Sequence, residues 1–304
     1  MDVLVIGAAG LDVKGRVTGP LQMGTSNPGR IRRSPGGVAR NIAENLARLG
    51  VEVTFISAVG EDWTGHHILQ QTQQAGVDVR HVLVRPDLHT GTYLALQDQE
   101  RQLIVGLDDM AGLEAITPRY LNDRRRLFRD ARMVVVDANL SPATLQTVFR
   151  LADQYGRPVC ADPTSTVLAA RLRPFLDQLH LATPNLEEAG ALLGEMGAGS
   201  APISMARRLV AEGVDLAVVT LAEEGLCYAT AEESGHLPAI TAPIVDRTGV
   251  GDALTAAVIC GLLEGLPPSE AVRLGLSAAA LTLQCQETVC PGLSLERLYG
   301  QLVV

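Results

Sequence analysis

Asp246-Arg-Thr-Gly-Val-Gly-Asp252, followed at once by Ala253-Leu-Thr-Ala-Ala-Val-Ile-Cys-Gly261, is the stretch that most restricts the fold and the chemistry of this chain. Two glycines around one residue let consecutive backbone N–H groups converge on a point, and the apolar run predicts a helix that begins there. The positive end of that helix would favour the negative charge of a phosphoryl group in transfer. The stretch therefore predicts an anion hole at Gly249, Val250 and Gly251, with Asp252 as the general base for a hydroxyl nucleophile.

Short apolar runs alternate with helical patterns along most of the chain. Near-continuous hydrophobic strands separated by helices indicate a parallel sheet that is covered on both faces. We therefore expect an α/β fold of three layers, with helices on both sides of a mostly parallel sheet. Strands are expected at 3–6, 53–58, 133–137, 159–162, 179–182, 216–221, 225–230 and 237–241, and helices at 38–49, 64–74, 142–154, 187–193, 205–211, 250–264, 268–284 and 293–302.

Two segments, at about 12–33 and 81–107, break this alternation. The first is rich in Gly, Pro and Ser. In the second, apolar runs at 92–96 and 102–105 flank a polar stretch, which predicts an antiparallel hairpin. Together they predict a small β-sheet that projects from the main body and acts as a lid over the C-terminal edge of the parallel sheet. No linker or repeat is found, so one domain is expected over 1–304.

The bulk composition excludes several classes of protein. A net charge of −9 argues against binding of nucleic-acid polymers, and 47% hydrophobic with 19% charged residues is typical of a globular chain. The five cysteines, at 160, 227, 260, 285 and 290, show no metal-binding spacing, so free thiols in a reducing compartment are expected. A signal peptide and an apolar run of membrane-spanning length are both lacking, which indicates a cytoplasmic location.

Polar residues follow the first strand and open the first helix. Gly7-Ala-Ala-Gly10 lacks the third glycine of a dinucleotide fingerprint, so an NAD-dependent dehydrogenase is rejected. Asp12 is either a turn or capping residue or a carboxylate at the ligand-binding end of a strand. Gly36 and Gly37 would let a ligand approach the backbone, and the Asn41 amide would bond a polyol hydroxyl. The plainer alternative for these three is a glycine-rich helix start with a capping Asn.

Two further motifs follow strands in the second half. Asn185 and Glu188 have the spacing of a capping box, and the alternative is that both face phosphates and the water shell of Mg²⁺. Thr220 and Gly225 bound a turn that would hold a nucleotide phosphate, although an ordinary β-turn has the same pattern. The histidines form no zinc or triad pattern, and no Walker A sequence is present.

The order of these motifs resembles that of the PfkB, or ribokinase-like, family of carbohydrate and nucleoside kinases, over essentially the whole chain. The resemblance implies a ribokinase-like three-layer αβα domain with a small β-sheet lid, and it implies ATP and Mg²⁺. By position it implies Asp252 as base and 249–251 as anion hole. It further implies sugar contacts at Asp12, Gly36, Gly37 and Asn41. Contacts to the nucleotide, its phosphates or magnesium are implied at Asn185, Glu188 (through water), Thr220 and Gly225. A monovalent-cation site is implied at Asp246 and Thr248.

Within the family, Ser26-Asn-Pro-Gly-Arg-Ile31 and Pro35-Gly-Gly-Val-Ala-Arg-Asn-Ile-Ala43 resemble the subgroup that transfers the γ-phosphoryl of ATP to the 5′-hydroxyl of a C-nucleoside. A nucleobase has a polar edge to be read, and we expect Lys14, Asn27 and Asp109 on the lid to contribute. The exposed edges of a lid sheet would pair between subunits, so a homodimer is expected.

Three departures from the family pattern stand out: Arg247 in place of a small hydroxyl residue, Ala222 in place of a glycine, and a 284–290 segment without the glycine expected near a monovalent cation. Dependence on K⁺ therefore stays open. The alternatives are another kinase of the family, acting on ribose, fructose, a keto-sugar acid or an ordinary nucleoside, and a noncatalytic sugar- or nucleotide-binding regulator. Because the latter should have lost its base, the presence of Asp252 disfavours it.

Overall fold

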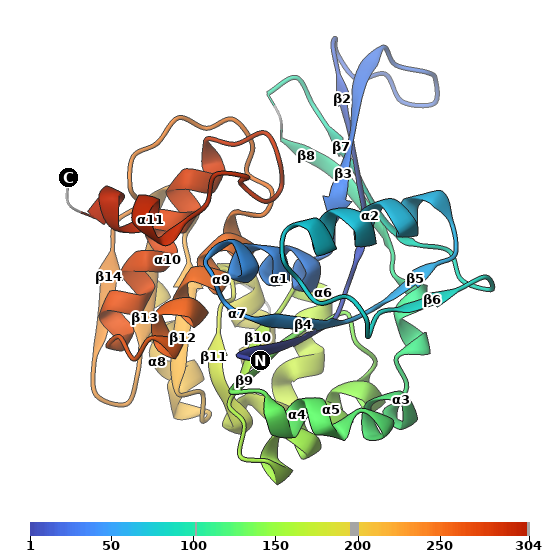
Figure 1. Ribbon diagram of the computed structural model, residues 1–304. Helices are drawn as coiled ribbons and strands as arrows, with labels where there is room; N and C mark the ends of the chain where they lie inside the picture. The colour runs from blue at the N-terminus through green and yellow to red at the C-terminus, as the bar shows by residue number, and fades with distance from the viewer. Residues whose placement is uncertain (101, 195–200, 303–304) are drawn as a thin grey trace.

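A computed structural model describes residues 1–100, 102–194 and 201–302. The body is built on an eight-stranded sheet in the order β14-β13-β12-β11-β10-β9-β1-β4 (Figure 1). Six strands run parallel, from β4 to β12 in this order; β13 is antiparallel to β12, and the edge strand β14 is antiparallel to β13. Their bounds are Val3–Ile6 (β1), Val53–Ile56 (β4), Met133–Asp137 (β9), Val159–Asp162 (β10), Leu179–Ala182 (β11), Leu216–Thr220 (β12), Leu226–Ala229 (β13) and Ser234–Leu237 (β14).

The sheet is covered on both faces because its strands are apolar on both. In β1 the side chains of Val3 and Val5 join one hydrophobic cluster, and those of Leu4 and Ile6 join the other. The first cluster packs against α1 (Val38–Arg48), α2 (Trp63–Gln74), α9 (Val250–Leu263), α10 (Pro268–Leu283) and α11 (Leu295–Leu302). The second packs against α3 (Pro118–Asp123), α4 (Arg125–Asp130), α5 (Pro142–Gln154), α6 (Thr166–Ala169), α7 (Leu186–Leu193) and α8 (Pro202–Ala211). This is the expected ribokinase-like three-layer arrangement.

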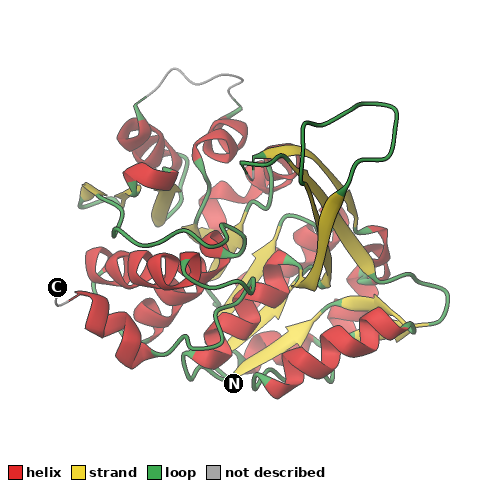
Figure 2. Cartoon of the chain, turned by 90° about the horizontal axis from the view of Figure 1, so that it is seen from above, coloured by secondary structure: helices red, strands yellow, loops and turns green. Residues whose placement is uncertain are grey.

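A separate four-stranded sheet forms the lid, in the order β3-β2-β7-β8. Figures 1 and 2 show it rising from one edge of the body, with the loop between β2 and β3 at its tip. Strands β7 (Gly91–Gln97) and β8 (Leu103–Asp109) pair antiparallel, so the expected hairpin is confirmed. Strands β2 (Gly10–Val17) and β3 (Gly29–Gly36) add the other half.

Several boundaries differ from those expected. The strand predicted at 53–58 is split, because β5 (Ala58–Gly60) leaves the main sheet and pairs with β6 (Leu83–Arg85). The last strand ends at Leu237 rather than beginning there. Short helical segments at 111–130 were not expected, since each is too short to show a helical period. Among the described helices, none combines the length and apolar character needed to cross a bilayer.

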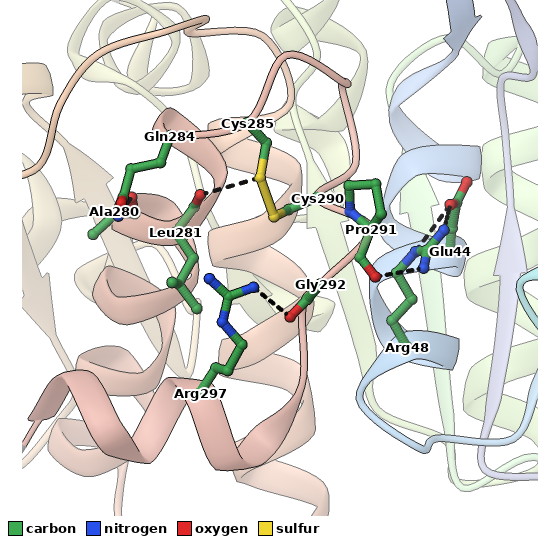
Figure 3. Close-up of a disulfide and its surroundings, with 10 residues drawn as sticks. All are labelled: Glu44, Arg48, Ala280, Leu281, Gln284, Cys285, Cys290, Pro291, Gly292 and Arg297. Atoms are coloured by element: carbon green, nitrogen blue, oxygen red, sulfur yellow. Dashed lines mark hydrogen bonds and ion pairs between the residues drawn. A yellow bond between two sulfur atoms is a disulfide. The ribbon is translucent and has the colours of Figure 1, made fainter.

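The expectation of five free thiols is wrong for two cysteines. Cys160, Cys227 and Cys260 are buried free thiols, whereas Cys285 and Cys290 form a disulfide, with their Cα atoms 5.6 Å apart (Figure 3). The loop that leaves α10 turns back on itself within five residues, which brings the two Cβ atoms together. The spacing of the cysteines predicts no partner for either residue. Because a disulfide is present, the cysteines no longer argue for a reducing compartment.

Candidate active site

The predicted nest lies at the N-terminus of α9. Gly249 is the N-cap in a left-handed conformation (φ 78°), and a Cβ at this position would lie 1.9 Å from the Thr288 carbonyl oxygen. A side chain is therefore excluded by both conformation and space. The N–H groups of the first helical turn have no acceptor within the helix, and none is found elsewhere in the described parts of the chain. A Cβ at Gly251 would meet nothing within 4 Å, so the space in front of the nest is open.

Asp252 lies in the first turn of α9 and is 8% exposed. Its Oδ2 accepts a hydrogen bond of 2.6 Å from Asn41 Nδ2 on α1. The fold thus brings together two predicted site residues that are 211 positions apart in the sequence. Burial raises the pKa of the Asp252 carboxyl to about 7, and nearby Asp12 and Asp137 act in the same direction. The Asn41 hydrogen bond and the Arg40 cation oppose this rise in the pKa. A carboxyl with such a pKa can accept a proton near neutral pH.

Asp12 is 6% exposed in the middle of β2, so the turn-or-cap alternative is wrong. Burial raises its pKa to about 6, against the opposing effects of Lys14 and Arg40. A Cβ on Gly36 would lie 2.0 Å from Asp12 Oδ1, and a Cβ on Gly37 (φ 92°) would meet the Ala8 carbonyl oxygen at 2.4 Å. The two glycines thus make room for the Asp12 carboxylate and for the backbone that follows β1.

Two carboxylates to which the sequence analysis assigned no role lie near this site. Asp137, at the end of β9, accepts hydrogen bonds from the backbone N–H groups of Ala8 (2.8 Å) and Ala39 (3.0 Å), and so fixes the start of α1 against the turn after β1. Asp162, at the end of β10, has its pKa raised by burial and by the charges of Asp252 and Glu188. Their position at the C-terminal ends of predicted parallel strands was the signal that would have found both.

A cavity of about 560 Å³ adjoins the nest. Five of its lining residues were predicted, and they come from three separate motifs: Asn185, Thr220, Gly225, Val250 and Gly251. The rest of the wall is largely apolar and includes Ile240, Leu276 and Leu283, which the sequence analysis missed because they look like ordinary core positions. An apolar pocket that opens onto a nest of N–H groups can hold a flat base at one end and phosphates at the other.

Asn185 and Glu188 form the capping box that was the plainer alternative for this pair. Asn185 Oδ1 accepts from the Glu188 N–H and Glu188 Oε2 accepts from the Asn185 N–H, each at 2.9 Å. Burial raises the pKa of Glu188. In the described parts of the chain no group of three His, Cys, Asp or Glu side chains converges on one point. Carboxylates that are near one another without converging fit a magnesium ion that keeps most of its waters.

The flank of the nest is tied to the lid by an ion pair. Lys14 Nζ, on β2, lies 3.1 Å from both carboxylate oxygens of Asp246, and Asp246 Oδ1 also accepts from the Thr248 N–H at 2.9 Å. Lys14 therefore already balances the charge of the carboxylate that the family resemblance assigns to a monovalent cation. Arg247, the first departure from the family pattern, is exposed and pairs with Glu223 at 2.5 Å.

The other predicted lid residues lie away from Asp252. Asn27 is in the tip loop, and its amide bonds the backbone of Gln22 and Thr25. Asp109 pairs with Thr92, on the lid face opposite to Asp12. The residues that share a row and a face with Asp12 are instead Ser34, Tyr93 and Asp108. The sequence analysis assigned no role to these three, because alternation in exposed strands is weak.

A glycine nest at a helix N-terminus, a buried carboxyl beside it, an apolar cavity and a β lid together define a kinase of the ribokinase-like type. Residues 1–292 match the pfkB family carbohydrate kinases. The chain is 35% identical to a pseudouridine kinase from Escherichia coli (strain K12) over 295 residues, which is 96% of this chain and 94% of that protein. It is 30% identical to a guanosine-inosine kinase from Exiguobacterium acetylicum over 289 residues, 94% and 95% of the two chains.

A solved structure of Arabidopsis thaliana ribokinase complexed with ribose and ATP has the same fold, with a TM-score of 0.86 at 22% identity over 100% of this chain and 99% of that one. The chain belongs to the pfkB family of carbohydrate kinases. It is accordingly a phosphotransferase with an alcohol group as acceptor and ATP as donor.

Proposed function

We propose that this protein is a pseudouridine kinase, which transfers the γ-phosphoryl group of ATP to the 5′-hydroxyl of pseudouridine. The similarity to the Escherichia coli pseudouridine kinase over nearly the whole of both chains carries the choice of acceptor. The geometry of Asp252 at the nest carries the choice of reaction. Asp12 and Asn41 would contact the ribose, because both lie beside Asp252 at the base of the lid.

Phosphoryl transfer needs positioning and stabilisation of charge more than covalent chemistry. The substrate hydroxyl, held between the lid and α1, attacks the γ-phosphorus in line with the leaving oxygen. Asp252 accepts the hydroxyl proton, and the backbone N–H groups at 249–251 stabilise the charge that develops on the phosphoryl oxygens. Asn185, Thr220 and Gly225 would contact the nucleotide from the cavity wall. Magnesium, held near Glu188 through water, would supply positive charge to the phosphates.

The site proposed for a monovalent cation lies beside a side-chain cation. Asp246 and Thr248 would bind K⁺ in competition with the Lys14 ammonium group, which lies 3.1 Å from the same carboxylate. We therefore propose that turnover depends only weakly on K⁺, and that Lys14→Met, which frees Asp246, increases that dependence. Initial rates between zero and 100 mM KCl at constant ionic strength, set with a tetraalkylammonium salt, measure it; a strong requirement for K⁺ in the unsubstituted protein would contradict the weak dependence.

We also propose that the protein is a cytoplasmic homodimer that associates through the lid. Residues directly opposite each other share a face, and the face that carries Lys14 also carries Arg16, Arg30 and Arg32. The opposite face carries Ile31, Leu94, Val105 and Leu107, with exposed fractions of 71%, 42%, 44% and 63%. An apolar sheet face of this size is expected to be covered by a second subunit, since monomers rarely expose one.

A panel of acceptors tests the substrate. ADP release is measured with ATP, Mg²⁺ and, separately, pseudouridine, uridine, guanosine, inosine, ribose or fructose. We expect kcat/KM for pseudouridine to exceed that for uridine by roughly tenfold or more, because a site that bonds the extra ring N–H leaves polar groups unpaired with uridine. Phosphorus-31 NMR of the product should show coupling to the two 5′ protons. If kcat/KM is greater with guanosine, inosine or ribose than with pseudouridine, the protein has the activity of another member of the family.

A further inference from the structure

Arg40 lies directly behind the candidate active site. Its guanidinium is buried, with 2% of the residue exposed, and it bonds neighbours on its own helix. Nη2 and Nε donate to Asn41 Oδ1 at 2.7 and 3.2 Å, and Nη1 lies 2.9 Å from Glu44 Oε2. A buried guanidinium is costly unless it is paired in this way. Its partners therefore indicate what it does there.

The orientation of the Asn41 amide decides what Asp252 meets. The two ends of a side-chain amide are almost equal in shape, but one accepts hydrogen bonds and the other donates them. A guanidinium only donates, so Arg40 fixes Oδ1 on its own side and leaves Nδ2 facing Asp252, where it donates at 2.6 Å. The flipped amide would place its oxygen against the Asp252 carboxylate and its NH₂ group against the guanidinium, and both contacts are repulsive.

We propose that Arg40 is a positioning residue for phosphoryl transfer, which acts through Asn41 to hold the Asp252 carboxylate in place and in its ionised form. The proposal rests on the proposed role of Asp252 as general base. Arg40 does not touch the reacting atoms, because Asn41 lies between it and Asp252.

The charges around Asp252 show why a cation is needed. Acidic groups face it from three other elements: Asp12 from β2, Asp137 at the end of β9 and Asp162 at the end of β10. Glu188 on α7 lies beside Asp162, and Lys14 acts on Asp12. Arg40 from α1 is the cation that lowers the pKa of Asp252 against this surrounding negative charge. Loss of Arg40 should therefore raise the pKa of the base and leave less of it ionised at neutral pH.

The same helix also provides a matched control. Glu44 Oε1 accepts from Arg48 Nε (3.0 Å) and Nη2 (2.6 Å), and Arg48 Nη1 donates to the Pro291 carbonyl oxygen at 3.0 Å. Figure 3 shows Arg48 between Glu44 and Pro291. Arg48 has the same charge, the same helix and the same acidic partner as Arg40, but it does not contact Asn41.

The test compares kcat/KM between pH 5.5 and 9 for the unsubstituted protein and for Arg40→Met, Arg40→Lys and Arg48→Met. In Arg40→Met we expect the midpoint of the acidic limb to rise by about one pH unit, so that activity lost at pH 7 is largely regained at pH 9. Arg40→Lys keeps the cation and should restore most of the midpoint. Arg48→Met should lose stability without moving the midpoint. If Arg40→Met does not fold, Arg40→Gln removes the charge with an amide that still fills the site, and the same rise is expected.

Two different failures can be distinguished. An acidic limb that survives in the residual activity of Asp252→Asn would show that Asp252 is not the titrating base, which overturns the proposed role of Asp252. A limb that disappears in Asp252→Asn but keeps its midpoint in the neutral Arg40 variants would overturn the role of Arg40 alone. A midpoint that moves as far in Arg48→Met as in Arg40→Met would show a general effect of charge on this helix and would also overturn it.

Discussion

The central sheet and the lid are both β-structure, yet they differ in what determines their residues. All four residues of β1 are fully buried, whereas all seven residues of β8 are exposed. In the first case the hydrophobic effect restricts every position, and in the second it restricts few. Buried strands can therefore be recognised in a sequence, but the residues of an exposed lid depend on a ligand or on another subunit.

The same contrast separates the site residues. On the body, the motifs at 185–188, 220–225 and 249–252 meet around one cavity and one nest, as their order predicts. On the lid, Lys14 reaches the flank of the nest, whereas Asn27 and Asp109 do not lie beside Asp252. Five predictions test how far this contrast between body and lid extends.

Substitution of the base on the body should have the largest effect. Asp252→Asn keeps the size of the side chain and a partner for Asn41 but cannot accept a proton. We expect kcat to fall by roughly a hundredfold or more, with little change in the Kd for ATP measured by calorimetry. In the unsubstituted protein kcat/KM should fall as the pH drops below about 7, because protonation of Asp252 removes the base. Near-normal turnover in the variant would contradict the assignment.

The same substitution should increase stability. The pKa of Asp252 is raised on folding from 3.8 to about 7, so the folded state binds this proton more tightly than the unfolded state. That contribution to stability is complete below pH 3.8 and is lost as the pH rises through about 7. Asp252→Asn should therefore raise Tm most at pH 8, less at pH 5 and not at all near pH 3.5. Equal Tm values for the two proteins at pH 8 would show that the carboxyl is not strained by burial.

The two glycines of the nest should differ from each other. Gly249→Ala forces a Cβ against the Thr288 carbonyl oxygen in a left-handed conformation, and we expect a loss of about 2–4 kcal/mol in the free energy of unfolding. Gly251→Ala meets no atom within 4 Å and should fold normally, but its methyl group enters the cavity and should raise KM for ATP. Urea unfolding and ATP titration measure the two effects. Similar losses of stability in both variants would contradict this account of the nest.

The succession of strands and helices along the chain, the three layers and the meeting of the body motifs could be predicted, because each depends on local pattern plus the rule that parallel strands place their C-terminal ends together. Arg40 could not be selected, because its role depends on the amide of Asn41 pointing toward Asp252, a contact across 211 positions. The Cys285–Cys290 pair was missed for a similar reason, since only the turn after α10 brings the thiols together. Asp108 and Asp109 could not be distinguished, because one residue of register decides which face each one occupies.

A change on the apolar face of the lid should alter association and leave folding unchanged. Leu107→Glu places a charge where a second subunit would cover the sheet, so the protein should become monomeric at micromolar concentration with its Tm nearly unchanged. Arg30→Glu, on the opposite face, is the control and should remain dimeric. Sedimentation velocity measures both. A dimer that persists in Leu107→Glu would place the subunit contact elsewhere.

The smallest effect is expected at Ala222, on the wall of the cavity. Its φ of 52° is in the left-handed region, which favours the glycine that the family pattern has at this position. Ala222→Gly removes about 1–2 kcal/mol of steric strain but adds about 0.5–1 kcal/mol of chain entropy, so a net gain of about 0.5 kcal/mol is expected. Thr164, at φ 66°, is the matched comparison, because its Oγ1 accepts a hydrogen bond from the Ala138 N–H at 3.2 Å. Thr164→Gly should therefore lose stability, although it relieves the same kind of strain. Urea unfolding of both variants measures the two changes, and so separates the cost of the left-handed conformation from the gain of the Thr164 hydrogen bond.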